Sequence, residues 1–149
     1  MIAKKTYLIF LIIAHLFLNG CGYTPIYSSN NIAFKISNIK YENNRINNKI
    51  SKSLKSISNS NSDNEINLII STKKQKRTLS KNKNGNAENF ELKIILKVNY
   101  LNNEKVFNIA QSYNNLDNKF ELSQYEKLLE NQLIEKAVDE VISYLINTQ

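Results

Sequence analysis

The side chains best suited to nucleophilic or acid–base chemistry are scarce in this chain of 149 residues. It has one cysteine, Cys21, and one histidine, His15. His15 lies inside an apolar run, and Cys21 follows shortly after that run ends. A lone cysteine cannot form a disulfide within its own chain. A role that needs a single sulfur atom, such as covalent attachment of another group to the thiolate, fits its number and place.

The residues before Cys21 have the order of a secretory signal. Lys4 and Lys5 precede an apolar segment at 7–18, and the small residue Gly20 stands directly before the cysteine. This apolar core of about 12 residues is shorter than the roughly 20 that a membrane-spanning helix needs. We therefore expect residues 1–20 to be a cleaved signal peptide. An uncleaved inner-membrane anchor is the alternative.

The stretch Leu18-Asn19-Gly20-Cys21 resembles the lipobox of bacterial lipoproteins. In that class the thiol is joined to diacylglycerol, the signal is cut before the cysteine, and the freed amine is acylated. The resemblance implies a covalent lipid on Cys21 and no other cofactor. Each buried CH₂ contributes about 0.8 kcal/mol, so several acyl chains hold a protein firmly. By the familiar sorting rule, Gly22 in place of aspartate implies the outer membrane.

An enzyme is not expected from the remaining residues. Cleavage removes His15 and acylation occupies Cys21, which leaves no histidine base, no thiol nucleophile and no soft metal ligand. Three glycines in the whole chain are too few for a phosphate-cradling loop. Acidic residues crowd 121–140, but Lys127 and Lys136 are interleaved with them. This mixture favours a solvated helix face over paired catalytic carboxylates.

One cluster of cations could bind a ligand, in a chain of net charge +7. Its members are Lys73, Lys74, Lys76, Arg77, Lys81 and Lys83. A patch of this kind attracts polyanions. For an exported protein, the phosphorylated head of lipopolysaccharide is a better candidate than nucleic acid. A solvated loop without a ligand is an equal alternative.

The spacing of apolar residues predicts the elements that must position this cluster. Alternation predicts strands around 32–36, from 66 onward, 90–100 and 107–113, and helical spacing predicts helices at 42–58 and 121–146. The second strand opens with Ile66, Leu68 and Ile70, and its far end turns basic. Residues 21–30 are expected to form an extended tether, 59–64 a loop, and Asn102-Asn103 a hairpin turn. The cations would lie at the end of the second strand and in the loop after it.

The simplest way to bury these faces is an α+β fold with the order β-α-β-β-β-α. We expect one domain at 31–149: a two-layer sandwich with a four-stranded, mostly antiparallel sheet and both helices packed on one face.

The chain also resembles the LptE family of lipopolysaccharide-assembly lipoproteins in its alphaproteobacterial form. The matching residues follow the lipobox and precede the last helix: Cys21, Gly22, Tyr23, Pro25, Tyr27, and Ser112-Tyr113-Asn114. The resemblance implies a lipoprotein that plugs the periplasmic lumen of the LptD β-barrel and binds lipopolysaccharide, which the pair inserts into the outer leaflet. It assigns no lipopolysaccharide-binding residue, so the cationic cluster is a separate inference.

Two functional hypotheses result. In the first, the protein is lipid-anchored on the periplasmic side of the outer membrane, with an LptD-type barrel, lipopolysaccharide and outer-membrane lipid as partners. In the second, it is an autonomous membrane-tethered periplasmic binding lipoprotein with no barrel partner. The second needs only the anchor and a globular sandwich.

Overall fold

A computed structural model of the chain describes residues 32–148. The elements are β1 (Lys35–Lys40), α2 (Arg45–Ile57), β2 (Glu65–Lys81), β3 (Ala87–Tyr100), β4 (Asn103–Asn114) and α3 (Lys119–Asn147). The predicted signal peptide, the lipid on Cys21 and the tether at 21–30 lie outside the described residues.

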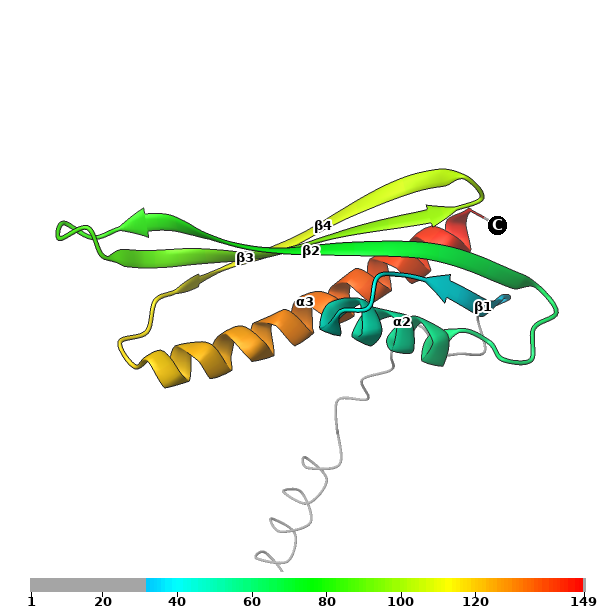
Figure 1. The fold of residues 1–149 in the computed structure, drawn as a ribbon, viewed down its shortest axis with the longest axis horizontal. Coiled ribbons are helices and arrows are strands. Elements are labelled where there is room, and N and C mark those ends of the chain that lie inside the picture. The colour runs from blue at the N-terminus through cyan, green and yellow to red at the C-terminus, as the bar shows by residue number, and fades with distance from the viewer. Residues whose placement is uncertain (1–31, 149) are drawn as a thin grey trace, which may run out of the picture.

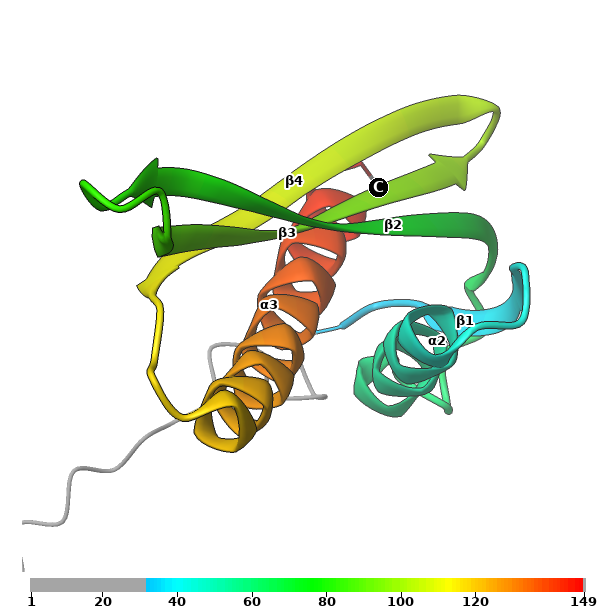
Figure 2. The ribbon, with the colours of Figure 1, turned by 60° about the vertical axis from the view of Figure 1, so that its left-hand side comes forward.

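The four strands form one sheet in the order β1-β2-β3-β4. β1 runs parallel to β2, and the other two pairs are antiparallel. Both helices lie on the same side of the sheet, as Figure 1 and Figure 2 show. The predicted α+β sandwich, with its β-α-β-β-β-α order and mostly antiparallel sheet, is confirmed.

The core fills the space between the sheet and the helices. On β3, alternate residues from Leu92 to Val98 face the helices and are at most 1% exposed. Leu54 of α2 and Val141 of α3 are fully buried against them. Burying an aliphatic side chain of this size stabilises a fold by roughly 1.5–3 kcal/mol. The alternation of β3 and the stripes of the helices therefore drive the two-layer packing.

Asparagine side chains set where both helices begin. Asn44 is the N-cap of α2, where its side chain accepts a hydrogen bond from the amide of Asn47. Asn118 caps α3 in the same way, with the amide of Phe120 as donor at 2.9 Å. Such a cap satisfies an amide that has no partner inside the helix. The first helix consequently begins at Arg45 and not at residue 42.

The strands differ from the prediction at three places. β1 begins at Lys35, although Ile32 and Phe34 before it are buried. β2 continues to Lys81, because its backbone pairs with β3 as far as Ala87 whatever side chains it carries.

The third difference is the β3–β4 turn, which lies at Leu101 and Asn102, one residue earlier than expected. Both residues have positive φ, 50° and 63°. This is the backbone shape of a two-residue hairpin turn, and Tyr100 pairs with Asn103 across it.

Within 32–148, no helix is both long and apolar enough to span a bilayer.

Candidate functional site

The extended β2 strand carries five of the six predicted cations, and Lys83 lies in the turn after it. Successive side chains of a strand point to opposite faces of the sheet. Lys74 and Lys76 share the helix-facing side with the buried Ile70, whereas Lys73 and Arg77 lie on the outer side. The structure therefore divides the cluster between two faces of the sheet.

Lys74 belongs to an ion-pair network beneath the sheet. Its ammonium lies 2.7 Å from Oε2 of Glu130 on α3, and Arg45 at the start of α2 pairs with Oε1 of the same carboxylate. Glu130 is 1% exposed. Helix α3 was expected to present its acidic residues to solvent, and for Glu130 this was wrong. Two cations from neighbouring elements compensate the burial of this carboxylate.

Lys76 forms a second ion pair with α3, one helical turn from Glu130. Its ammonium lies 2.6 Å from Oε1 of Glu126, and the hydroxyl of Tyr113 donates to the same oxygen at 2.8 Å. The ammonium also sits 4.1 Å from the centre of the Phe90 ring, a cation–π contact. Burial raises the pKa of Tyr113, and its hydrogen bond to Glu126 raises it further.

Burial acts to raise the pKa of Glu126 as well, but hydrogen bonds from Lys76 and Tyr113 outweigh it, so that this pKa is lowered. Lys74 and Lys76 thus connect β2 to α3. Their charges are matched within the protein, which leaves them little capacity for an external anion.

The outer face of the sheet holds the cations best placed for a ligand. Arg77 pairs across the strands with Glu91 at 2.7 Å. Lys73 and Lys93 form no ion pair within the described part of the chain. The register sets Lys93 opposite Gln75, between Lys73 and Arg77. We call Lys73, Gln75, Arg77 and Lys93 the outer-face group.

A shallow hollow of about 660 Å³ lies at this group. It is lined by Lys74, Gln75, Lys76, Arg77, Glu91, Lys93, Asn108 and Ala110. Ala110 pairs with Lys93 and is too small to fill the surface beside it. Amide and ammonium groups around an open hollow can donate hydrogen bonds to a phosphate or carboxylate.

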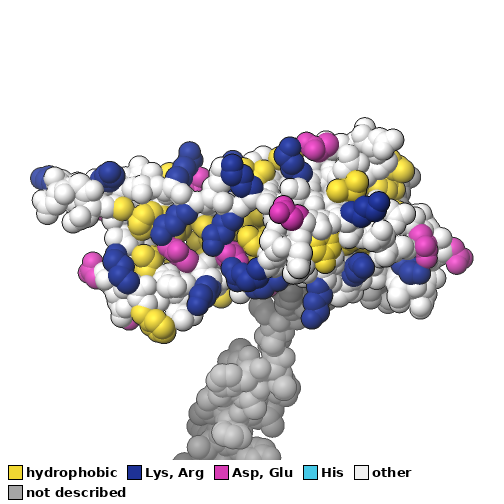
Figure 3. Space-filling model, viewed as in Figure 1, with side chains coloured by type: hydrophobic (Ala, Val, Ile, Leu, Met, Phe, Trp, Pro, Cys, Tyr) yellow, Lys and Arg dark blue, Asp and Glu magenta, His cyan; other side chains and the backbone are white. Residues whose placement is uncertain are grey.

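Lys93 was not part of the predicted cluster, although the alternation of its strand already put it on the outer side. Only the pairing of β2 with β3 shows that it stands beside Lys73. Figure 3 shows Lys and Arg side chains spread over one view of the molecule, with apolar side chains visible between them.

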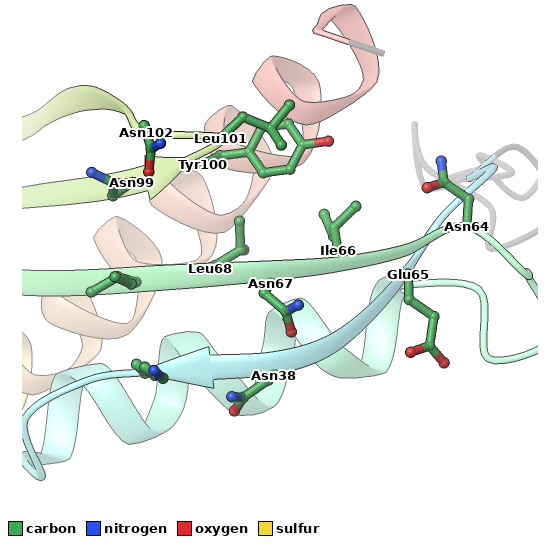
Figure 4. A pocket seen from close by; sticks show the side chains of 12 residues that line it. Asn38, Asn64, Glu65, Ile66, Asn67, Leu68, Asn99, Tyr100, Leu101 and Asn102 are labelled. Atoms are coloured by element: carbon green, nitrogen blue, oxygen red, sulfur yellow. The ribbon is translucent and has the colours of Figure 1, made fainter.

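A second hollow, of about 610 Å³, lies at the other end of the sheet. The β2–β3 pairing stops at Ile69 and Asn99, and the hollow lies between the start of β2 and the β3–β4 turn, whose residues Leu101 and Asn102 line it. Figure 4 shows amide side chains around this gap, among them those of Asn38, Asn67 and Asn102. Lys40 and Glu65 also line it, so the hollow offers amide donors and acceptors together with one charge of each sign.

The described residues offer few other side chains that could bind a metal ion or act as an acid or base. No group of three or more His, Cys, Asp or Glu side chains within 32–148 could hold a metal ion. Glu65, beside the second hollow, is paired with Lys35 at 2.6 Å, and this hydrogen bond lowers the pKa of its carboxyl.

Comparison with known proteins identifies solved structures that share this fold. No family model matches the chain, and no curated protein matches it. Among solved structures, rare lipoprotein B from Shewanella oneidensis is similar, with 16% identity and a TM-score of 0.57 over 75% of this chain and 96% of that one. An uncharacterized lipoprotein B from Nitrosomonas europaea has 17% identity and a TM-score of 0.56, over 74% and 83% of the two chains. Likeness at this level of identity establishes a shared fold.

Proposed function

We propose that this protein is an outer-membrane lipoprotein that assembles with an LptD-type β-barrel and takes part in lipopolysaccharide transport. Two independent features support the lipoprotein part of the proposal, and the barrel partnership rests on the resemblance to the LptE family. One is the order of residues 18–21, with a single cysteine after a short apolar segment. The other is a fold shared with two proteins that are named as lipoproteins.

In this proposal the lipid on Cys21 holds the domain at the periplasmic side of the outer membrane. Residues 22–31 join the anchor to the first described residue, Ile32. An extended chain spans at most about 3.3–3.6 Å per residue, so the domain stays within roughly 40 Å of its anchor. A domain on so short a tether can contact barrel proteins and lipid head groups of the same membrane.

Lipopolysaccharide is the proposed ligand of the outer-face group. Lys73 and Lys93 form no ion pair in the described domain. Lys93 lines the open hollow, and Lys73 lies on the same face of β2, two residues from Gln75 of the lining. Phosphate groups are matched by ammonium groups, and this attraction weakens as salt is added. The role is that of a binding and assembly subunit, and the proposal includes no catalytic step.

The decisive experiment is affinity purification of the tagged full chain from solubilised membranes. We expect a large β-barrel protein to co-purify. Cys21→Ser should remove the lipid, detected as a loss of acyl mass, and release the protein from the membrane fraction. Cys21→Ala is the matched second substitution, because it also lacks the thiol but carries no hydroxyl.

A lipidated protein that recovers no barrel would contradict the partnership while keeping the anchor. Normal surface lipopolysaccharide after depletion of the protein would then favour the autonomous tethered binding lipoprotein. An unlipidated wild-type chain would contradict the anchor itself.

A further inference from the structure

One long side of β2 has no strand beside it for much of its length. β1 pairs with β2 only from Glu65 to Ile69. Lys40, the last residue of β1, is the partner of Ile69. β2 continues to Lys81, and no other strand of the described chain joins it on that side. Figure 1 shows β2 and β3 running together well past the end of β1. Beyond Ile69, β2 is therefore an edge strand.

The pairing with β1 identifies which backbone groups this free edge offers. The amide of Lys35 donates to the carbonyl of Asn64 at 2.8 Å, so the even-numbered residues of β2 direct their N–H and C=O toward β1. Backbone groups alternate in direction along a strand. The same direction beyond β1 belongs to Thr72, Lys74, Lys76 and Thr78. Odd-numbered residues are turned toward β3.

The charge along this edge selects the kind of strand that could join it. Residues 66–81 contain no acidic side chain, and they include Lys73, Lys74, Lys76, Arg77 and Lys81. A second copy of β2 would bring the same cations opposite one another, which destabilises strand pairing. An acidic strand would instead meet the cations of the outer face, where Lys73 forms no ion pair within the described residues and Arg77 lies on the same face. Lys74 and Lys76 on the helix-facing side are already paired with Glu130 and Glu126, but they add no acidic side chain to the edge.

β4, the other edge of the sheet, lacks this bias. It carries Glu104 beside Lys105, and its remaining residues are uncharged. Lysines on an edge strand also keep sheets from pairing indiscriminately. This protective effect acts against apolar or basic strands and leaves an acidic one favoured.

We propose that the edge of β2 from Thr72 to Thr78 accepts an extended acidic segment of a partner protein as an additional strand. Backbone hydrogen bonds would supply the pairing and the cations the selectivity, as in other strand-addition complexes. The inference rests on residues 64–81 and is independent of the lipid anchor and of the barrel partnership.

The test uses the full-length chain in detergent micelles and a synthetic peptide that alternates glutamate with valine over the length of the free edge. Amide hydrogen exchange at Thr72, Lys74, Lys76 and Thr78 should slow by roughly tenfold or more when the peptide is bound. Affinity should fall between about 0.1 M salt and about 1 M salt, where the screening length is near 3 Å.

Two peptide controls separate strand addition from charge attraction. A peptide with lysine in place of glutamate should not bind. A glutamate peptide with methyl groups on alternate backbone nitrogens keeps its charge but cannot pair, and it should bind at least about tenfold more weakly. Equal affinity for the methylated peptide would overturn the proposal.

One pair of protein variants tests the same point from the other side. Thr78→Pro removes an N–H that faces the free edge and leaves the bonds to β3 in place. It should abolish peptide binding, whereas Thr78→Val, which keeps the N–H, should not. Peptide binding that survives in Thr78→Pro would overturn the proposal. So would protection of these four amides that rises with protein concentration alone, because it would assign the edge to a second copy.

Discussion

Lys74 on β2 and Glu130 on α3 are joined by an ion pair of 2.7 Å in which the carboxylate is 1% exposed and the lysine side chain 42%. A second pair, Lys76 with Glu126, repeats the contact at 2.6 Å. Four helical residues rise about 6 Å and two strand residues about 6.6 Å. The matching intervals let an antiparallel helix and strand form both pairs in register. The two contacts hold α3 against the part of β2 that contains Lys74 and Lys76.

The first prediction concerns the two cations that share Glu130. Lys74→Met and Arg45→Met should each lower the free energy of unfolding by about 1 kcal/mol, since the other cation stays and both lysine and arginine are partly exposed. The double variant leaves a buried carboxylate without a partner and should lose about 3–5 kcal/mol. Urea denaturation of the four proteins measures the coupling. Strictly additive losses would show that the two cations act separately.

The second prediction tests the core of the sheet. Leu96 on β3 is fully buried. Leu96→Ala should lower the free energy of unfolding by about 2–5 kcal/mol through the cavity it leaves. Ile69→Ala is the matched control on the outer face, where the side chain is 54% exposed. It should change stability by less than about 0.5 kcal/mol. Similar losses for both variants would mean that the outer face is covered by something else.

Side-chain pattern was sufficient to predict the architecture. β3 alternates without interruption from Leu92 to Val98, and a long stripe of apolar residues marks α3, so both elements could be assigned from sequence. The ends of the strands were harder to predict from the sequence. β2 loses its apolar alternation after Ile70 but continues to Lys81 because β3 offers it backbone partners. A local pattern cannot show a strand that is held by pairing alone.

The candidate site was harder to predict than the fold. Proximity in sequence suggested one patch, but strand alternation sends Lys73 and Lys74 to opposite faces. Lys93 joins Lys73 only through the register between β2 and β3. The buried Glu130 could not be distinguished from its exposed neighbours on α3 without knowing that Arg45 and Lys74 lie against it. Each of these relationships depends on tertiary packing.

The third prediction is a pH dependence centred on Glu126. The folded-state pKa of this carboxyl lies below its ordinary value of 4.5. A lowered pKa means that Glu126 adds stability above its unfolded-state pKa, and that this stability is lost as pH falls through the folded-state pKa. The difference in unfolding free energy between the wild type and Glu126→Gln should be full at neutral pH. It should shrink steadily as pH falls below about 4.5.

Denaturant unfolding of both proteins across this pH range measures the difference. Using the difference removes the contribution of Asp139, whose pKa is raised by burial and whose effect has the opposite sign. A difference that is constant with pH would mean that Glu126 gains nothing from ionisation in the folded state.

The last prediction concerns the outer-face group. Lys73→Ala with Lys93→Ala should weaken binding of purified lipopolysaccharide, because both ammonium groups lie on the outer face without an ion-pair partner in the described domain, and Lys93 lines the open hollow. The loss should be larger at about 0.1 M salt than at about 1 M, where exposed charges are screened within about 3 Å. Lys52→Ala with Lys55→Ala on α2 removes the same charge from another surface and should have a smaller effect. Equal losses in the two double variants would show that net charge, and not the outer-face group, governs binding.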